Sequence, residues 1–336
     1  MSLSIRVLDP SCDADLDDYF AFDRSVDEAL TGGCDYQTLE RYRLLASDTV
    51  YARRLRLIAS EGGVVRGSAL LELPLRENLD MAMFFVSVHP RLTNTRVAEA
   101  LAEEAAAAAA GAGREKLSMW GVVPGEGDPD DPALLSNRIA ARLGLSRKSL
   151  AVARVAPLPV PQRRLEQLGA SVAARNGGYR VLTWRDRTPE EYLDAMCALH
   201  RQLDLDEPDE DYEGEVPDYT PERIRYLEQR RQDTGRAAIV AVAAAPGGEL
   251  VAHSEVQFST HPASTLAWQE NTIVMPGHRG HGLGLTLKLA SHAALPEAAP
   301  GIRQIVTWNS HVNPQMIAIN EALGYRPRFR EICYQP

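Results

Sequence analysis

The sequence has few cysteines, no long apolar run and no excess of positive charge. Its four cysteines are scattered, with no two within three residues of each other, so the spacing predicts neither a metal-binding knuckle nor a redox pair. A chain of 336 residues can bury a core of its own without a disulfide framework. The longest apolar run, residues 237–245, covers nine residues, whereas about 20 are needed to cross a bilayer. We therefore expect no metal site and no membrane partner.

The charge balance argues against another class of partner. Acidic residues number 46 and basic residues 36, which gives a formal net charge of −10 at pH 7. Binding to nucleic acid irrespective of sequence needs a positive surface, so no nucleic-acid partner is expected. Apolar residues make up 45% of the chain and charged residues 24%, as is typical of a soluble globular protein. Residues 1–10 lack the apolar segment of a secretion signal, so we expect a reducing, cytoplasmic setting.

The C-terminal half contains a readable order of elements. Two apolar stretches around a Pro-Gly-Gly turn predict a β-hairpin, and a third strand over residues 266–275 is followed by a glycine-rich loop. Asn313 and Pro314 are typical of the N-cap and first position of a helix, which Gly324 would end. The predicted order is three strands, the loop, a helix, a strand, a helix and a last strand.

The N-terminal half repeats this plan. Matching landmarks recur at offsets between 180 and 188 residues, which indicates two copies of one fold. We predict an N-terminal domain over residues 1–157, a linker helix within residues 158–176 and a C-terminal domain over residues 177–336. The landmark pairs are Gly62 and Gly247, Arg91 and Arg279, Trp120 and Trp308, and Gly144 and Gly324.

The strongest functional signal is the glycine-rich loop within residues 271–288. Gly280, Gly282 and Gly284 would let main-chain N–H groups approach an anion without obstruction by side chains. The helix that follows adds unpaired N–H donors and a partial positive charge at its N-terminus. These features predict a pyrophosphate site. The loop lacks both the Gly-Lys-Ser/Thr of a P-loop and the glycine spacing of a dinucleotide fingerprint.

The pattern Arg279-x-x-Gly282-x-Gly284 after an apolar strand resembles the acyl-CoA loop of the GNAT-type N-acetyltransferases. The predicted order of elements over residues 236–334 also matches the core of that family. The resemblance implies an α/β (α+β) class, with a tandem GNAT-like acyl-CoA N-acyltransferase fold. Each half would have a central mixed, mostly antiparallel sheet flanked by helices.

The resemblance also implies acetyl-CoA as cosubstrate and assigns residues to it. The third strand would contact the pantetheine arm and the thioester carbonyl, the loop would surround the pyrophosphate, and two asparagines would meet the pantetheine from the next strand and helix. Helix capping by one of these asparagines is compatible with that contact. In this order the residues are Ile273, Val274 and Met275; Arg279, Gly280, His281, Gly282, Leu283, Gly284 and Leu285; and Asn309 and Asn313.

The N-terminal half lacks the glycines. Aligning Arg91 with Arg279 places Leu92, Asn94 and Arg96 where the three glycines stand. Their side chains would crowd the main-chain donors, so we expect a single acyl-CoA site, in the C-terminal half. The N-terminal half would serve as a scaffold or shape the substrate cleft.

The chemistry of an amine acceptor indicates which catalytic groups the protein needs. An amine with a pKa of about 10.4 must lose a proton before it attacks, and a carboxylate acting through water is the expected aid. Glu270 stands at the strand position where the family often has such a base, with Glu255 in reserve; a solvated strand-edge carboxylate is the alternative for each. The family often protonates the departing thiolate with a tyrosine of the last helix. Asn320 stands there, so Tyr325, Tyr334 or solvent would serve instead.

Two further features of the sequence have more than one interpretation. The acidic stretch 204–218 contains nine acids and no base; it would favour a cationic amine if it borders the acceptor site, or it is a solvated loop. His278 and His281 lie in the glycine-rich loop without a carboxylate or cysteine at ligand spacing, so they indicate loop packing or a phosphate contact rather than a metal.

Together these observations predict an N-acetyltransferase that moves an acetyl group from acetyl-CoA to the primary amine of a small molecule or peptide. The attack would be direct, in a ternary complex. The tandem layout is also similar to that of mycothiol synthase, so an acyltransferase of that kind is one alternative. A non-catalytic acyl-CoA-binding or sensing protein is the other.

Overall fold

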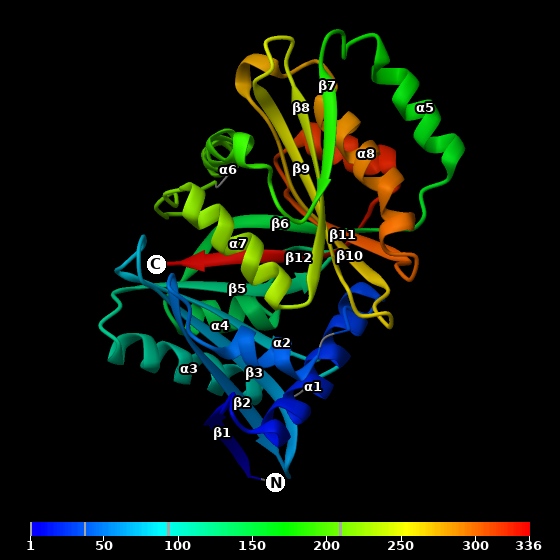
Figure 1. Cartoon of the computed structure of the whole chain (residues 1–336). Helices are drawn as coiled ribbons and strands as arrows, with labels where there is room; N and C mark the ends of the chain where they lie inside the picture. Colours follow the sequence, from blue (N-terminus) through cyan, green and yellow to red (C-terminus); the bar gives the residue numbers. More distant parts are fainter. Residues whose placement is uncertain (1, 37, 93–94, 208–209) are drawn as a thin grey trace.

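The computed structural model describes residues 2–36, 38–92, 95–207 and 210–336. Asn94, which the sequence analysis aligned with Gly282, and Asp209 of the acidic stretch lie outside the described residues. Helices and strands follow the order β-α-α-β-β-β-α-β-α-β in the first half, and the second half has the same order with two added 3-10 turns. In Figure 1 the N-terminal half is the lower part of the molecule and the C-terminal half the upper part.

The elements have the following bounds. The first half contains β1 Leu3–Val7, α1 Asp13–Thr31, α2 Leu39–Ala46, β2 Ala52–Glu61, β3 Val64–Pro74, β4 Met81–Val88, α3 Arg96–Gly111, β5 Lys116–Pro124, α4 Leu135–Arg142 and β6 Ser146–Pro157. The linker helix is α5 Gln162–Ala173. The second half contains β7 Arg180–Arg185, α6 Leu193–Asp206, α7 Pro221–Asp233, β8 Arg236–Ala244, β9 Leu250–Ser259, β10 Leu266–Val274, α8 Leu283–Ala298, β11 Gln304–Ser310, α9 Pro314–Leu323 and β12 Arg326–Gln335, with 3-10 turns at Glu190–Tyr192 and Pro276–His278.

All strands of the described residues form one sheet. Its order is β1-β2-β3-β4-β5-β12-β6-β11-β10-β9-β8-β7. The pairs β4·β5 and β10·β11 are parallel, and the other neighbours are antiparallel. The predicted mixed, mostly antiparallel sheet flanked by helices is therefore confirmed. The two halves share this sheet, which continues across the boundary predicted after residue 157.

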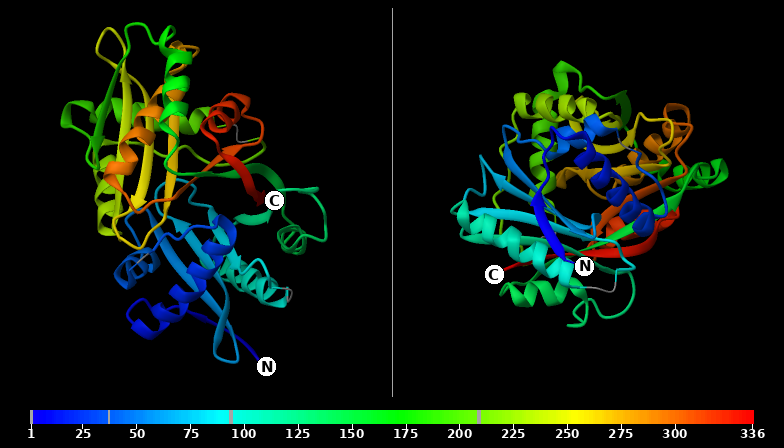
Figure 2. Two further views of the ribbon diagram at one scale, coloured as in Figure 1. Left: turned by 90° about the vertical axis from the view of Figure 1, so that its right-hand side faces the viewer. Right: turned by 90° about the horizontal axis from the view of Figure 1, so that it is seen from below.

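The two halves exchange their last strands at the centre of this sheet. β12, the last strand of the chain, lies between β5 and β6 of the first half, as Figure 1 and the views in Figure 2 show. β6, the last strand of the first half, pairs in turn with β11 of the second half, from Pro157 opposite Gln304 to Ala151 opposite Ser310. Each half therefore depends on the other for a neighbour of its parallel pair.

Helices cover both faces of the C-terminal part of the sheet. β8 is apolar along nearly its whole length because it is buried on both faces. Its Ala241 and Ala243 pack with Leu287 of α8, whereas the alternate residues Val240 and Val242 pack with α6. The first half has a core of its own beneath α3. No helix within the described residues is long and apolar enough to cross a membrane.

The sequence located most of these elements to within a few residues. Asn313 caps α9 by accepting a hydrogen bond from Met316 N at 3.1 Å, and Gly324 ends the helix with a φ of 96°. The linker helix is found as α5. Local patterns did not predict the four elements of residues 1–61, the strand β7 or the exchange of β6 and β12.

The strand exchange leads to a first prediction. Deletion of residues 326–336 removes a central strand with neighbours on both sides, together with the buried side chains of Ile332 and Tyr334, which are at most 3% exposed in the intact chain. We expect that truncated chain to lose its cooperative thermal transition, followed by circular dichroism.

A deletion at the other end of the chain is the control. Removal of residues 2–8 takes away β1, an edge strand that pairs only with β2. That chain should still melt cooperatively, at a lower temperature. If both deletions behave alike, β12 does not occupy the central position.

Candidate functional site

The parallel strands β10 and β11 part halfway along their length. They pair only from Leu266 opposite Gln304 to Trp268 opposite Val306. The register of β10 with β9 then shifts between Gln269 and Thr272, which marks a bulge containing Glu270. Beyond the bulge β10 continues along β9, and β11 continues along β6. The main-chain polar groups of both strands that face the gap therefore have no neighbouring strand to pair with.

The glycine-rich loop follows β10 and leads into α8. Gly280 and Gly282 have φ angles of 83° and 72°, in the region that favours glycine, and Gly282 is the N-cap of α8. The main-chain N–H groups of residues 280–285 donate to no acceptor within the described parts of the chain. The first turn of a helix leaves such donors unpaired and carries partial positive charge. The loop therefore presents a set of free donors suited to an anion.

Side chains hold this loop in shape. Arg279 donates through Nε to Val274 O at 3.1 Å, and its guanidinium pairs with Asp206. His278 Nδ1 lies 2.9 Å from the hydroxyl of Tyr179, and His281 Nδ1 lies 3.1 Å from a main-chain carbonyl at the end of α5. Both histidines thus take part in loop packing. Across residues 2–36, 38–92, 95–207 and 210–336, no three His, Cys, Asp or Glu side chains are grouped to hold a metal ion.

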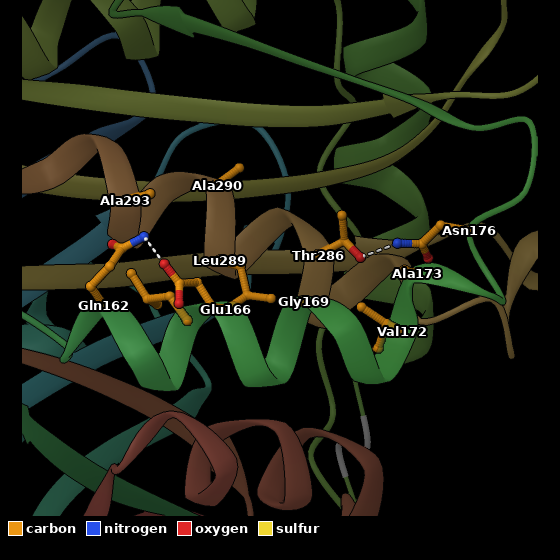
Figure 3. Close-up of a pocket in the computed structure, with 11 residues that line it drawn as sticks. Gln162, Glu166, Gly169, Val172, Ala173, Asn176, Thr286, Leu289, Ala290 and Ala293 are labelled. Atoms are coloured by element: carbon orange, nitrogen blue, oxygen red, sulfur yellow. Dashed lines mark hydrogen bonds between the residues drawn. The ribbon is translucent and has the colours of Figure 1, made fainter.

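The linker helix α5 lies against the outer side of α8 (Figure 3). A groove of about 400 Å³, mostly apolar, separates the two helices. At its end Asn176 Nδ2 donates to Thr286 Oγ1 at 2.7 Å, and Val172 packs so closely on Gly282 that a Cβ there would lie 2.9 Å from Val172 Cγ1. The linker helix therefore fixes the position of the loop and requires glycine at 282.

The strand before the loop contributes one free donor to the gap. Met275 N donates to Val251 O of β9 at 2.8 Å. Because alternate residues of an antiparallel strand bond to the same neighbour, the N–H of Val274 points the other way, toward the side that β11 has left. Ile273 is buried, 5% exposed, in the core beneath α6. Of the three strand residues predicted to meet a ligand, Val274 has the suitable main-chain geometry.

On the α8 side of the sheet, the gap is filled by a buried polar cluster. Lys288 Nζ donates to Asn320 Oδ1 at 2.7 Å, and Asn320 Nδ2 donates to Asn309 Oδ1 at 3.1 Å. Arg154 Nη1 donates to the same Asn309 oxygen at 2.9 Å. All four side chains are less than 9% exposed. Burial lowers the pKa of Lys288 to about 7 and also lowers that of Arg154.

On the α6 and α7 side, the gap is bordered by two carboxylates that differ in their hydrogen bonds. Glu255 accepts hydrogen bonds from Arg231 Nη1 at 3.1 Å and from Gln257 Nε2 at 2.7 Å. Glu270, at the bulge, is half-buried, and its carboxylate accepts no hydrogen bond from the residues described here. Burial raises the pKa of Glu270. Glu270 is therefore the carboxylate that is free to take a proton.

A buried histidine lies beside these carboxylates. His253 of β9 is 1% exposed, and neither of its ring nitrogens has a hydrogen-bond partner in the described structure. Burial holds its pKa well below the usual range, and the nearby His200 and Arg231 act in the same direction. His253 is therefore neutral and can exchange a hydrogen bond with a polar group that enters from the α6 side.

Most of the acidic stretch ties the two halves together. Glu210 Oε1 accepts from Leu150 N at 2.9 Å, and Glu215 Oε2 accepts from Asn78 N at 2.8 Å. Asp204 is partly buried beside Tyr219 and His200, and Asp206 pairs with Arg279.

Three side chains of the site were missed from the sequence. Lys288 had a visible signal, because it is a lone lysine among Leu and Ala residues in the first turns of α8. Arg154 reaches the cluster only through the exchange of β6, and His253 only through the pairing of β9 with β10, so neither had a local signal.

The loop gives a second prediction, based on two glycines with similar φ angles. Gly280→Ala meets no atom within 4 Å, so it should cost about 1 kcal/mol of strain. Gly282→Ala adds the contact with Val172, so we expect a loss of about 2–3 kcal/mol and at least tenfold weaker binding of coenzyme A by calorimetry.

A relieving substitution tests the cause. The double variant Val172→Ala, Gly282→Ala should recover part of the lost affinity, because the contact at 2.9 Å is removed. Equal affinities for the two glycine variants would contradict the assigned role of the loop.

Comparisons with known proteins agree on the fold. No family model matches the sequence, and a search of curated proteins found no match. A solved tandem GNAT protein from the clavulanic acid biosynthesis pathway aligns with a TM-score of 0.76 and 24% identity, over 100% of this chain and 98% of that one. A GCN5-related N-acetyltransferase from Sphaerobacter thermophilus aligns with a TM-score of 0.66 and 13% identity, over 99% of this chain and 95% of that one.

A third solved structure is of a different kind. The N-myristoyltransferase of Saccharomyces cerevisiae with bound myristoyl-CoA aligns with a TM-score of 0.56 and 11% identity, over 99% of this chain and 78% of that one. These likenesses extend over both halves and the linker between them. The chain therefore has the tandem GNAT fold.

Proposed function

We propose that this protein is an N-acyltransferase that moves an acetyl group from acetyl-CoA to the primary amine of a small molecule or peptide. The observation that carries the proposal is the set of free main-chain donors at residues 280–285, next to the point where β10 and β11 part. Nucleotide pyrophosphates bind at helix N-termini of this kind. The tandem GNAT fold of the solved neighbours supports the same conclusion.

The residues present fit acyl-CoA as cosubstrate. The donors of the loop would hold the pyrophosphate, and the free N–H of Val274 would meet the pantetheine arm or the thioester carbonyl in the gap between the strands. Asn309, from β11, faces the same gap. When bound, acetyl-CoA supplies an activated acyl group, and the protein's part is to position it and to move protons.

The polar cluster on the α8 side supports a short acyl group. A long hydrocarbon chain needs an apolar channel, because contact with buried charges would cost free energy. Here Lys288 and Arg154, at 1% and 5% exposure, occupy the space on that side of the gap. This supports acetyl rather than the longer myristoyl group that the N-myristoyltransferase structure contains as myristoyl-CoA.

Glu270 is the proposed general base. Its carboxylate accepts no hydrogen bond within the described parts of the chain, and the raised pKa brings it closer to the pH at which proton transfer is most effective. The amine would lose its proton to Glu270, directly or through water, and then attack the thioester carbon. His253, neutral and without a hydrogen-bond partner among the described residues, would orient the amine. Glu255 is less suited as a base because Arg231 and Gln257 already engage it.

The acceptor is proposed to be a small amine, with a cationic one favoured. Support comes from Glu270 and Glu255, whose carboxylates border the α6 side of the gap, and from Asp204, which lies beside His200 and Tyr219. We further propose a cytoplasmic location, which the lack of a disulfide among the four cysteines favours.

A thiol-release assay tests the function. The protein is incubated with acetyl-CoA and a panel of primary amines, and free thiol is followed together with the mass of each amine. We expect thiol release that depends on one class of amine, with about one CoA bound per chain by calorimetry. Tight CoA binding without thiol release across the panel would favour the sensing alternative. Absence of CoA binding would reject the proposal.

The base assignment gives a separate prediction. Glu270→Gln should lower turnover about 10²-fold near pH 7. The loss should shrink toward pH 10, because the amine then loses its own proton. The raised pKa of Glu270 also predicts that wild-type kcat/KM rises with pH through that pKa, and the variant should lack this rise.

Glu255→Gln is the matched control for this prediction. It should keep the rise of kcat/KM with pH and lower the melting temperature through loss of its pairing with Arg231. If Glu255→Gln loses the rise and Glu270→Gln keeps it, the two roles are reversed.

A further inference from the structure

Lys288 is a buried lysine beside Asn320, the residue that replaces the expected tyrosine acid and for which the sequence left Tyr325, Tyr334 or solvent as substitutes. Its side chain is 1% exposed, and its Nζ donates to Asn320 Oδ1 at 2.7 Å. Asn320 stands where the resemblance places a tyrosine hydroxyl. The hydrogen bond therefore puts the amino group of Lys288 next to the amide that replaces the tyrosine.

No described carboxylate neutralises this cation in the interior. The groups that face Lys288 are His292 of α8, Asn320 of α9 and the ring of Tyr325, whose centroid lies 5.8 Å from Nζ. His292 is neutral, because burial and Lys288 lower its pKa to about 3, and Tyr325 is kept protonated by burial, which raises its pKa.

A second cation meets the same pair of asparagines. Arg154 Nη1 bonds to Asn309 Oδ1, and its Nε has no partner among the described residues although the side chain is 5% exposed. Glu321 is the acidic residue whose charge acts on Arg154, where it raises the pKa of the guanidinium against the effect of burial. Two cations that share two amides and lack a buried carboxylate form an environment that favours a transient anion.

We propose that Lys288 is the general acid of the acyl transfer and protonates the departing CoA sulfur. The inference rests on the proposed function, since it needs the thioester to lie in the gap beside Asn309 and Asn320. In the step, the neutral amine nitrogen forms a bond to the thioester carbon, and its extra proton passes to water. The tetrahedral intermediate then collapses with cleavage of the carbon–sulfur bond. The electron pair stays on sulfur, which takes a proton from the Lys288 ammonium. Neutral Lys288 then regains a proton from solvent.

The chemistry of the site suits this role. A lysine at its ordinary pKa would be a weak acid toward a thiolate, whereas burial brings the pKa of Lys288 to about 7. The proton is then held by a group of acidity similar to or greater than that of the thiol. Asn320 accepts from Nζ and so orients the ammonium.

The test uses coenzyme A itself and needs no knowledge of the acceptor. The thiolate of bound CoA is followed by its ultraviolet absorbance as a function of pH, in the wild type and in Lys288→Met. An opposite charge within hydrogen-bond reach lowers the pKa of an acid by about 1–3. We expect the pKa of bound CoA thiol to be lower by about one pH unit or more in the wild type than in Lys288→Met.

Three controls separate this effect from a packing defect. Desulfo-CoA, which lacks the thiol, should bind equally to the wild type and to Lys288→Met. Lys148→Met makes the same chemical change outside the site and should leave the pKa of the thiol unchanged. Asn320→Asp, nearly isosteric, places a carboxylate beside Nζ and should raise the pKa of the thiol, and it serves as the second variant if Lys288→Met does not fold.

The outcomes separate the two proposals. An equal thiol pKa in the wild type, Lys288→Met and Asn320→Asp, with CoA bound in each, overturns the role of Lys288 and leaves the acyl-CoA site in place. Absence of CoA binding to the wild type overturns both. A lowered thiol pKa that both variants lose supports Lys288 as the acid, as does a fall in amine-dependent thiol release without loss of desulfo-CoA affinity.

Discussion

The structure depends on keeping two neighbouring strands apart inside a continuous sheet. After Val306, β11 has lost β10 as a partner, and its last four residues pair only with β6. Without β6, those residues would present unpaired main-chain groups on both edges, which a folded interior does not tolerate. The exchange of β6 and β12 therefore does more than join two halves: it stabilises one wall of the candidate site. The same exchange brings Arg154 to that wall, so the N-terminal half contributes a side chain to the polar cluster as well as support.

The loop after β10 likewise depends on contacts from another part of the chain, the linker helix α5. Its free donors are useful only if the turn keeps its shape, and that shape comes from contacts with α5: Val172 against Gly282, and Asn176 with Thr286. The linker is thus a structural part of the anion site. This explains why glycine is required at 282 for two reasons, the φ angle and the close approach, whereas at 280 only the φ angle requires it.

Sequence patterns predicted the structural features that neighbouring residues determine. The cap at Asn313, the stop at Gly324 and the glycine-rich turn are written in neighbouring residues, and each is found in the structure. The strand exchange has no such signal, because β6 and β12 look alike to any argument based on periodicity and differ only in their distant partners. The polar cluster could not be assembled for the same reason: Arg154, Lys288, Asn309 and Asn320 come from four elements. The sequence singled out Asn309 and Asn320 separately through the resemblance, and the missed Lys288 had a signal as a charge in an apolar helix, but its meaning required the position of Asn320.

The two faces of the sheet have opposite electrostatic character at the gap. Glu270 and Glu255 border the side of α6 and α7, whereas Lys288 and Arg154 fill the side of α8 and α9. In an unbroken sheet, groups on opposite faces are separated by the ladder and do not reach the same atom. Because β10 bulges and β11 departs, groups from both faces border the same gap. In the proposed reaction one proton is removed from the attacking nitrogen and one is supplied to the departing sulfur, and the proposed base and acid lie on opposite faces. The break in the sheet would let both act on one substrate.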